Sequence, residues 1–80
     1  MITGDYVGHE GIVCHALVYE KDGQLYVRSY GEDRILKYCE GTVFASYDEK
    51  TGERINTYRF FIQDGHAWGV KVGTRVFRRA

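Results

Sequence analysis

Two Asp-Gly pairs, Asp22-Gly23 and Asp64-Gly65, each lie between runs of aromatic and β-branched residues. A two-residue hairpin connection that matches the twist of its strands needs positive φ, which Gly adopts freely and Asp tolerates better than most residues. Such pairs are the strongest short-range signal for a β-hairpin. They predict that the chain folds into an antiparallel sheet.

Apolar and aromatic runs separated by polar turns predict further strands. The expected strands are residues 12–20, 24–30, 35–38, 42–48, 54–63 and 66–72, while residues 75–79 could form a last short strand and residues 2–7 could pair at an edge. Residues 35–38 are short enough to form one helical turn instead, and a polar break is expected at 31–34. No window of about eleven residues shows the apolar stripe of an amphipathic helix. We therefore expect an all-β chain with a single domain, residues 1–80, folded as an antiparallel meander of about five to seven short strands.

The meander is expected to roll into a barrel or to form a strongly curved sheet. The chain has no Pro, so it lacks one common means of protecting an open strand edge. Closure would remove the edges, whereas an open edge would need charges or a second copy of the chain to cover it. A homodimer joined at sheet edges is therefore the alternative to closure.

Residues 66–72 show the clearest alternation. The pattern places Trp68, Val70 and Val72 on one face of the strand, and Ala67, Gly69 and Lys71 on the other. A regular strand would therefore point Trp68 in the same direction as the two valines.

The composition is that of a folded domain, since 44% of the residues are apolar and 15% are aromatic. The first residues lack a basic region followed by an apolar stretch, so we expect a cytoplasmic protein. Cys14 and Cys39 would then stay reduced and act as small buried apolar residues. A disulfide between them would add about 3 kcal/mol of stability.

His9, Glu10, Cys14 and His15 form the densest cluster of potential metal ligands. Their spacing matches neither a helical nor a structural zinc site, so we expect no metal and no cofactor. A nucleophilic pair built from Cys14 or Cys39 with His15 or His66 is a further possibility. Cys14 and His15 would point to opposite faces of a strand, and a sheet of this size has little room for a substrate cleft. A thiol-dependent and His-dependent enzyme is therefore the third hypothesis, and a non-enzymatic role is expected.

The leading hypothesis is a non-catalytic binding module that inhibits or regulates another protein by covering part of its surface. Residues 1–40 carry four Lys or Arg and seven Asp or Glu. All seven tyrosines precede residue 59, and Tyr is enriched at protein interfaces. The residues expected to bind the partner are Tyr19, Tyr26, Tyr30, Glu32 and Asp33. This face would suit a partner with a basic surface, including one that handles nucleic acid, and viruses or mobile elements often encode small proteins of this type.

The alternative is a small barrel that binds nucleic acid directly. Residues 41–80 carry seven Lys or Arg and four Asp or Glu, interleaved with aromatic rings, as in platforms for single strands. The candidate residues are Arg54, Arg59, Lys71, Arg75, Arg78 and Arg79. A net charge of +0 argues against this alternative, because phosphate neutralisation supplies most non-specific affinity.

Overall fold

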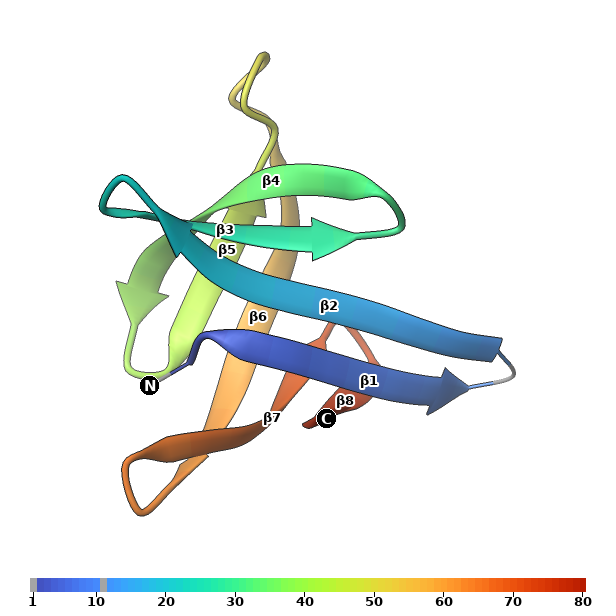
Figure 1. The fold of residues 1–80 in the computed structure, drawn as a ribbon. Coiled ribbons are helices and arrows are strands. Elements are labelled where there is room, and N and C mark those ends of the chain that lie inside the picture. The colour runs from blue at the N-terminus through green and yellow to red at the C-terminus, as the bar shows by residue number, and fades with distance from the viewer. Residues whose placement is uncertain (1, 11) are drawn as a thin grey trace.

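The computed structural model describes residues 2–10 and 12–80, and the side chains of all of these except residues 9, 10, 12 and 13. Eight strands follow one another along the chain (Figure 1). They are β1 (Gly4–Glu10), β2 (Ile12–Lys21), β3 (Gln24–Ser29), β4 (Glu32–Glu40), β5 (Val43–Tyr47), β6 (Arg54–Gln63), β7 (His66–Val72) and β8 (Arg75–Arg79). Each strand pairs antiparallel with the next, and β1 also pairs with β8, which closes the sheet into a barrel. The prediction of an all-β antiparallel meander is confirmed, with eight strands instead of five to seven.

Closure follows from the pairing of the two terminal strands. Tyr6 lies opposite Arg79, and Val7 lies opposite Arg78. Every strand now has a hydrogen-bonded neighbour on both sides, so within the described residues the sheet has no unpaired edge strand. Within the described residues, no helix has the length and apolar character needed to cross a membrane.

Both Asp-Gly pairs form the expected hairpin turns. The φ angles are 53° at Asp22 and 79° at Gly23, and 54° at Asp64 and 78° at Gly65. Positive φ at both central positions is the type I′ geometry, whose twist suits the flanking strands. The Asp-Gly rule therefore places the β2–β3 and β6–β7 turns correctly.

A third turn of the same kind joins β3 to β4, at the start of the polar break that the sequence predicted. Tyr30 and Gly31 have φ angles of 54° and 76°, so Ser29 pairs directly with Glu32. The predicted polar break at 31–34 is wrong, because β4 already begins at Glu32. The expectation that Tyr30 extends the strand of Tyr26 is also wrong. A left-handed backbone at an aromatic residue is uncommon, and propensity rules therefore give no warning of it.

The core fills the barrel from one end. Its largest fully buried side chains include Tyr6, Phe60, Leu36, Val18, Val27 and Val70. The ring of Phe60 meets the rings of Tyr6 and Phe44 edge to face, with centroid separations of 5.7 and 5.5 Å. Large rings thus fill the interior of a barrel whose eight strands leave just enough room for side chains.

Arg79 covers this filled end of the barrel. Its guanidinium donates hydrogen bonds to the Tyr6 hydroxyl and to the Ala67 and Thr3 carbonyl oxygens, at 3.1, 3.1 and 2.6 Å. The guanidinium lies so close to Gly4 that a Cβ there would be 3.0 Å away from it. The Tyr6 hydroxyl in turn donates to the Ile2 carbonyl at 2.7 Å. Arg79 therefore ties the last strand to the N-terminal segment and to β1.

We predict that Arg79→Met lowers the free energy of unfolding by about 2–3 kcal/mol, since the change removes charge-assisted hydrogen bonds but keeps an unbranched side chain that can occupy the path of the arginine stem. The neighbouring variant Arg78→Met should change it by no more than about 0.5 kcal/mol, because Arg78 lies on the outer surface. Urea unfolding followed by far-ultraviolet circular dichroism measures both values. Equal effects of the two variants would contradict a closing role for Arg79.

Candidate functional site

Outward-pointing residues of β6, β7 and β8 form a surface that combines cations with aromatic rings. Tyr58, Phe60 and Phe77 are buried in the core, so strand alternation points their neighbours outward. The strand positions on this surface, called the basic-aromatic face below, are Arg54, Thr57, Arg59, Phe61, Trp68, Lys71, Val76 and Arg78. Arg54 lies on this side because the register of β5 and β6 shifts between Ala45 and Tyr47, which adds one residue to β6 between Arg54 and Thr57. The face follows three consecutive strands, whose hydrogen-bonded pairing holds its side chains in fixed register.

A β-bulge places Trp68 on this face. Phe61 pairs with Gly69 and Ile62 pairs with Ala67, so Trp68 is one extra residue on β7. The extra residue reverses the alternation: Ala67 is buried, whereas Trp68 is 42% exposed. The prediction that Trp68 shares a face with the valines of this strand is therefore wrong. Alternation within a single strand assumes regular pairing, and a bulge interrupts that pairing.

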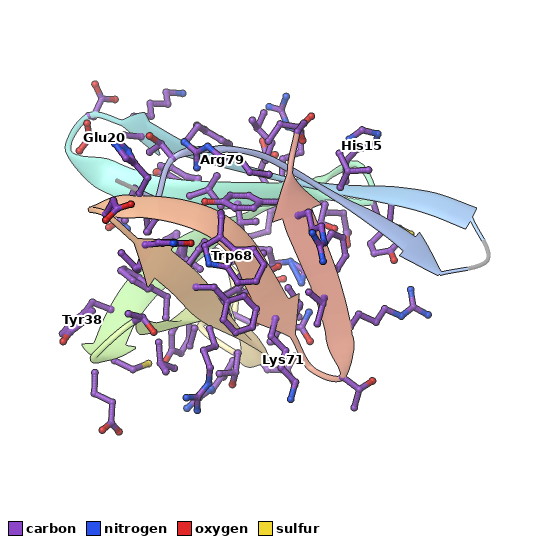
Figure 2. The ribbon with its side chains drawn as sticks, turned by 90° about the horizontal axis from the view of Figure 1, so that it is seen from below. His15, Glu20, Tyr38, Trp68, Lys71 and Arg79 are labelled. Carbon is purple, nitrogen blue, oxygen red and sulfur yellow. The ribbon has the colours of Figure 1, made fainter. Side chains whose placement is uncertain are left out.

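Trp68 stacks on the ring of Phe61, with centroids 5.0 Å apart and planes inclined by 19°. The guanidinium carbon of Arg78 lies 5.9 Å from the centre of the indole ring, within the range of a cation–π contact. Figure 2 shows Trp68 and Lys71 on the same side of the sheet. The bulge and the stack thus present an aromatic platform with a cation beside it.

The charges on the basic-aromatic face all have the same sign. Arg59 and Lys71 are directly opposite each other on β6 and β7, and the Arg54 guanidinium donates to the Thr57 hydroxyl at 3.0 Å. Among the residues that the structure describes, no Asp or Glu occupies one of these strand positions. The face therefore attracts anions although the whole chain has no net charge.

Four of the six cations predicted to bind nucleic acid share this face, and two do not. Arg54, Arg59, Lys71 and Arg78 are the four. Arg75 and Arg79 occupy the alternate positions of β8, with Phe77 between them in the core. Arg79 covers the filled end of the barrel, and Arg75 donates to the Tyr30 hydroxyl at the other end, at 3.3 Å. The six residues are close in the sequence, but strand alternation places Arg75 and Arg79 away from the other four.

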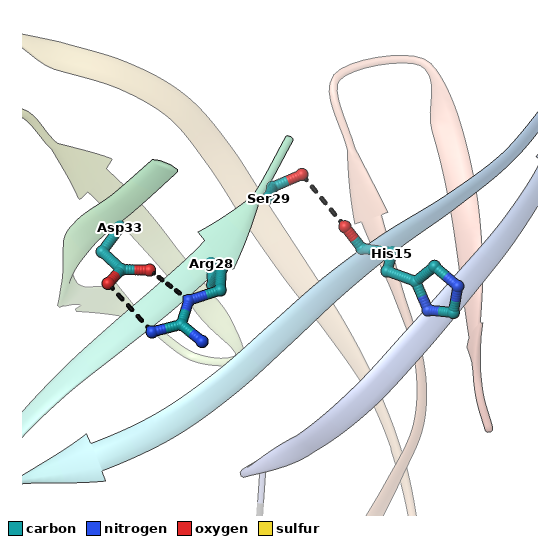
Figure 3. Close-up of polar contacts among 4 residues, drawn as sticks. All are labelled: His15, Arg28, Ser29 and Asp33. Carbon is teal, nitrogen blue, oxygen red and sulfur yellow. Dashed lines mark hydrogen bonds and ion pairs between the residues drawn. The ribbon is translucent and has the colours of Figure 1, made fainter. Parts of the chain in front are cut away.

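The tyrosine-rich site predicted for a protein partner also divides into two parts. Tyr19 and Tyr26 are cross-strand neighbours whose rings stack with a centroid separation of 5.5 Å. Arg28 lies 5.6 Å from the centre of the Tyr19 ring and forms two hydrogen bonds with Asp33, at 2.6 and 3.1 Å (Figure 3). The hydrogen bond from Arg28 lowers the pKa of Asp33. Because Arg28 offsets its charge, this surface is not the acidic one that the sequence predicted.

Tyr30 and Glu32 lie apart from this tyrosine pair. Glu32 follows the Tyr30-Gly31 turn on the face opposite to Asp33 and forms an ion pair with Arg34 at 2.6 Å. The Tyr30 hydroxyl donates to the Cys14 sulfur at 3.2 Å. This hydrogen bond is the main reason why the pKa of Tyr30 is raised.

Cys14 and His15, the candidate thiol and imidazole that are adjacent on β2, do not form a catalytic pair. Cys14 is buried in the core, whereas His15 is exposed and its Nδ1 lies 3.4 Å from the Asp5 carboxylate. The prediction that these two side chains point to opposite faces is confirmed. Cys39 is a free, exposed thiol and not a buried residue, and it lies at a register shift near the end of β4.

Metal binding gains no support from the described side chains. Among them, no group of three or more His, Cys, Asp or Glu could hold an ion. The side chains of His9 and Glu10, part of the ligand cluster noted in the sequence, lie outside the described residues.

The expectation that the sheet leaves little room for a cleft is wrong. Inner-face residues line a cavity of about 490 Å³ at the end of the barrel opposite Arg79. The sequence alone does not predict this cavity, because its volume depends on which inward positions carry small residues once the barrel is closed.

We predict that Gly69→Ala destabilises the bulge. A Cβ at this position would lie 2.9 Å from the Phe77 carbonyl oxygen and 3.4 Å from the ring of Phe61, so the backbone or the stacked rings must shift. We expect a loss of about 1–3 kcal/mol in the free energy of unfolding, as for other overpacked sites. Lys71→Ala, on the exposed side of the same strand, should change it by less than about 0.5 kcal/mol. Urea unfolding of the two variants tests this, and equal stability of Gly69→Ala and the wild type would contradict a close approach of β7 and β8.

The comparison with known proteins assigns no family to this chain. No family model, no curated protein and no solved structure matches it. The geometry and charge of the described surfaces therefore carry the functional proposal.

Proposed function

We propose that this barrel is a non-catalytic binding domain that holds single-stranded nucleic acid on the basic-aromatic face. The observation that carries the proposal is the exposed indole of Trp68, which stacks on Phe61 beside Arg78, on a face whose strand positions carry four cations. Every nucleobase has a flat aromatic surface, so stacking on such a platform is tolerant of sequence. Arginine and lysine side chains beside the platform would neutralise the phosphates of the same strand.

The net charge of zero does not argue against this proposal, because the cations are gathered on one face of the barrel. Field lines near a protein surface depend on nearby groups, and salt screens charges that are more than about 8–10 Å away. Away from this face, Asp33 forms an ion pair with Arg28, and Glu32 forms one with Arg34. A phosphate chain near Arg59 and Lys71 therefore meets a local excess of positive charge.

We predict that Trp68→Ala weakens the binding of a fluorescein-labelled oligothymidine of about 16 nucleotides by roughly 5- to 150-fold, the effect of losing the stacking of one base. Fluorescence anisotropy at low salt measures the affinity. Trp68 is the single tryptophan of the chain, so quenching of its fluorescence reports stacking directly in the wild-type protein. Undiminished affinity of Trp68→Ala, or no binding by the wild type, would contradict the proposal.

Salt dependence tests the role of the cations separately. With four phosphate contacts, a plot of the logarithm of the association constant against the logarithm of the salt concentration should have a slope of about −3. Arg59→Gln should lower the magnitude of this slope by about 0.7. Lys21→Gln is the matched control, because it removes the same charge from the end of β2. Arg78→Glu should weaken binding more than Arg75→Glu, since only Arg78 lies on the face. Equal losses from all four changes would indicate a non-specific effect of net charge.

A second candidate function is binding to another protein, which would be inhibited or regulated when this barrel covers its surface. The stacked pair of Tyr19 and Tyr26 favours it, because the pair is half-buried, rigidly placed and flanked by the Arg28–Asp33 ion pair. Aromatic residues next to arginine are typical of the residues that contribute most to interfaces. The surface combines apolar area with balanced charge, so its partner would need both signs of charge and not a basic surface alone.

For this candidate we predict that Tyr26→Ala weakens the affinity for a protein partner by about 30-fold, as expected for a central interface aromatic. Trp68→Ala should leave the same affinity within about twofold, because Trp68 lies on different strands. Isothermal titration calorimetry with a partner recovered by the wild-type protein measures both. The reverse order of effects would move the protein contact to the basic-aromatic face.

A further inference from the structure

The end of the barrel opposite Arg79 contains a cavity that the binding of nucleic acid on the outer face does not use. Its volume is about 490 Å³, within the range of small-molecule sites, which often occur in the mouths of β-barrels. In Figure 1 the β3–β4 turn, part of its rim, lies on the side away from the β2–β3, β4–β5 and β6–β7 turns. The barrel thus has one end filled by rings and Arg79, and one end that is hollow.

The hollow arises because small residues occupy inward positions near this end. Ala16 and Ser46 are both almost completely buried and line the cavity, together with apolar surface from Val27, Val72 and Phe77. Such a wall accepts the apolar body of a ligand, since burial of apolar surface is favourable.

The polar groups deep in the cavity are ordered. The Asn56 backbone N–H donates to the Ser46 hydroxyl oxygen at 3.1 Å, and that hydroxyl donates to the Asn56 carbonyl oxygen at 3.4 Å. Burial raises the pKa of Tyr58, whose hydroxyl lies beside Ser46, so this phenol stays neutral at physiological pH. Among the described residues, no buried side-chain nitrogen or oxygen lacks a hydrogen-bond partner. The floor therefore has a fixed shape and no charge of its own.

The rim supplies the charge. Among the described residues, Arg34, Glu32 and Arg75 line this end of the cavity. Glu32 is paired with Arg34 at 2.6 Å, and the Arg75 guanidinium is positioned by its hydrogen bond to Tyr30 at 3.3 Å. A guanidinium presents planar N–H donors that suit the oxygens of a carboxylate, sulfonate or phosphate.

We infer that this cavity binds a small organic anion, with an aromatic or aliphatic body against Val27, Val72 and Phe77 and its acidic head at Arg75. The site uses inward positions of the barrel, whereas the basic-aromatic face uses outward ones. Occupation of the cavity is therefore independent of the proposed nucleic-acid function.

The test compares two fluorescent probes with nearly the same aromatic body. Anilinonaphthalene sulfonate carries an anionic head, and phenylnaphthylamine lacks it. We expect saturable binding of the sulfonate with one site per chain, and at least about tenfold weaker binding of the neutral probe, the effect of a lost charge-assisted hydrogen bond. Equal affinity for the two probes would overturn the assignment of an anion.

Variants locate the site. Arg75→Gln should weaken the sulfonate about tenfold or more and leave the neutral probe within about twofold. Arg59→Gln is the matched control on the outer face: it should leave both probes unchanged while it weakens the oligothymidine. Unchanged sulfonate affinity in Arg75→Gln, or an equal loss in Arg59→Gln, would overturn the proposal even if the barrel binds nucleic acid.

A loosely folded chain also binds this dye, so near-ultraviolet circular dichroism of each variant must match the wild type. Backbone amide shifts in a nitrogen-15 correlation spectrum provide a second measurement on the wild-type protein. Shifts at Ser29, Asn56 and Thr74, which line the cavity, are expected on addition of the sulfonate. Shifts confined to residues outside the cavity would overturn the assignment.

Discussion

The pairing of β1 with β8 is the contact on which the rest of the structure depends. It joins residues more than seventy positions apart through a short register, with Tyr6 opposite Arg79 and Val7 opposite Arg78. Without it the chain would be an open meander with two unpaired edges. Closure gives every strand an inner and an outer face. The hydrogen bonds of the Arg79 side chain to Tyr6, Thr3 and Ala67 add to the backbone pairing that holds the two ends of the chain together.

The bulge at Trp68 changes the outer surface of the closed barrel. One additional residue on β7 lets Ala67 fill the interior and turns a large indole towards solvent. Exposure of such a ring has a cost in hydrophobic free energy of roughly 25 cal/mol per Å² of apolar surface left in water. The stack on Phe61 recovers part of that area, and the base stacking proposed above would cover more of it.

Much of the fold could be predicted because its signals are local. Asp22-Gly23 and Asp64-Gly65 define their turns through their own φ preferences, and the bounds of β6, β7 and β8 match the expected ranges. The Tyr30-Gly31 turn and the bulge at Trp68 could not be predicted in this way. The first contradicts the preference of its own residue, and the second is a property of how two strands pair, which no single strand reveals. The candidate site was predicted in part for the same reason: its cations were recognisable, but their separation into outer and inner sets requires the register.

Strand β8 shows how much a single short strand can do under alternation. Arg75, Phe77 and Arg79 point inward, and in order they reach the hollow end, the core and the filled end of the barrel. Val76 and Arg78 point outward, where Arg78 lies beside Trp68. A shift of this strand by one residue would exchange the inward and outward residues. Arg79 would then leave the filled end, Arg75 would leave the hollow end, and Arg78 would no longer lie beside Trp68. Pairing on both sides, with β7 and with β1, opposes such a shift. The same register that closes the barrel therefore also fixes where its positive charge can act.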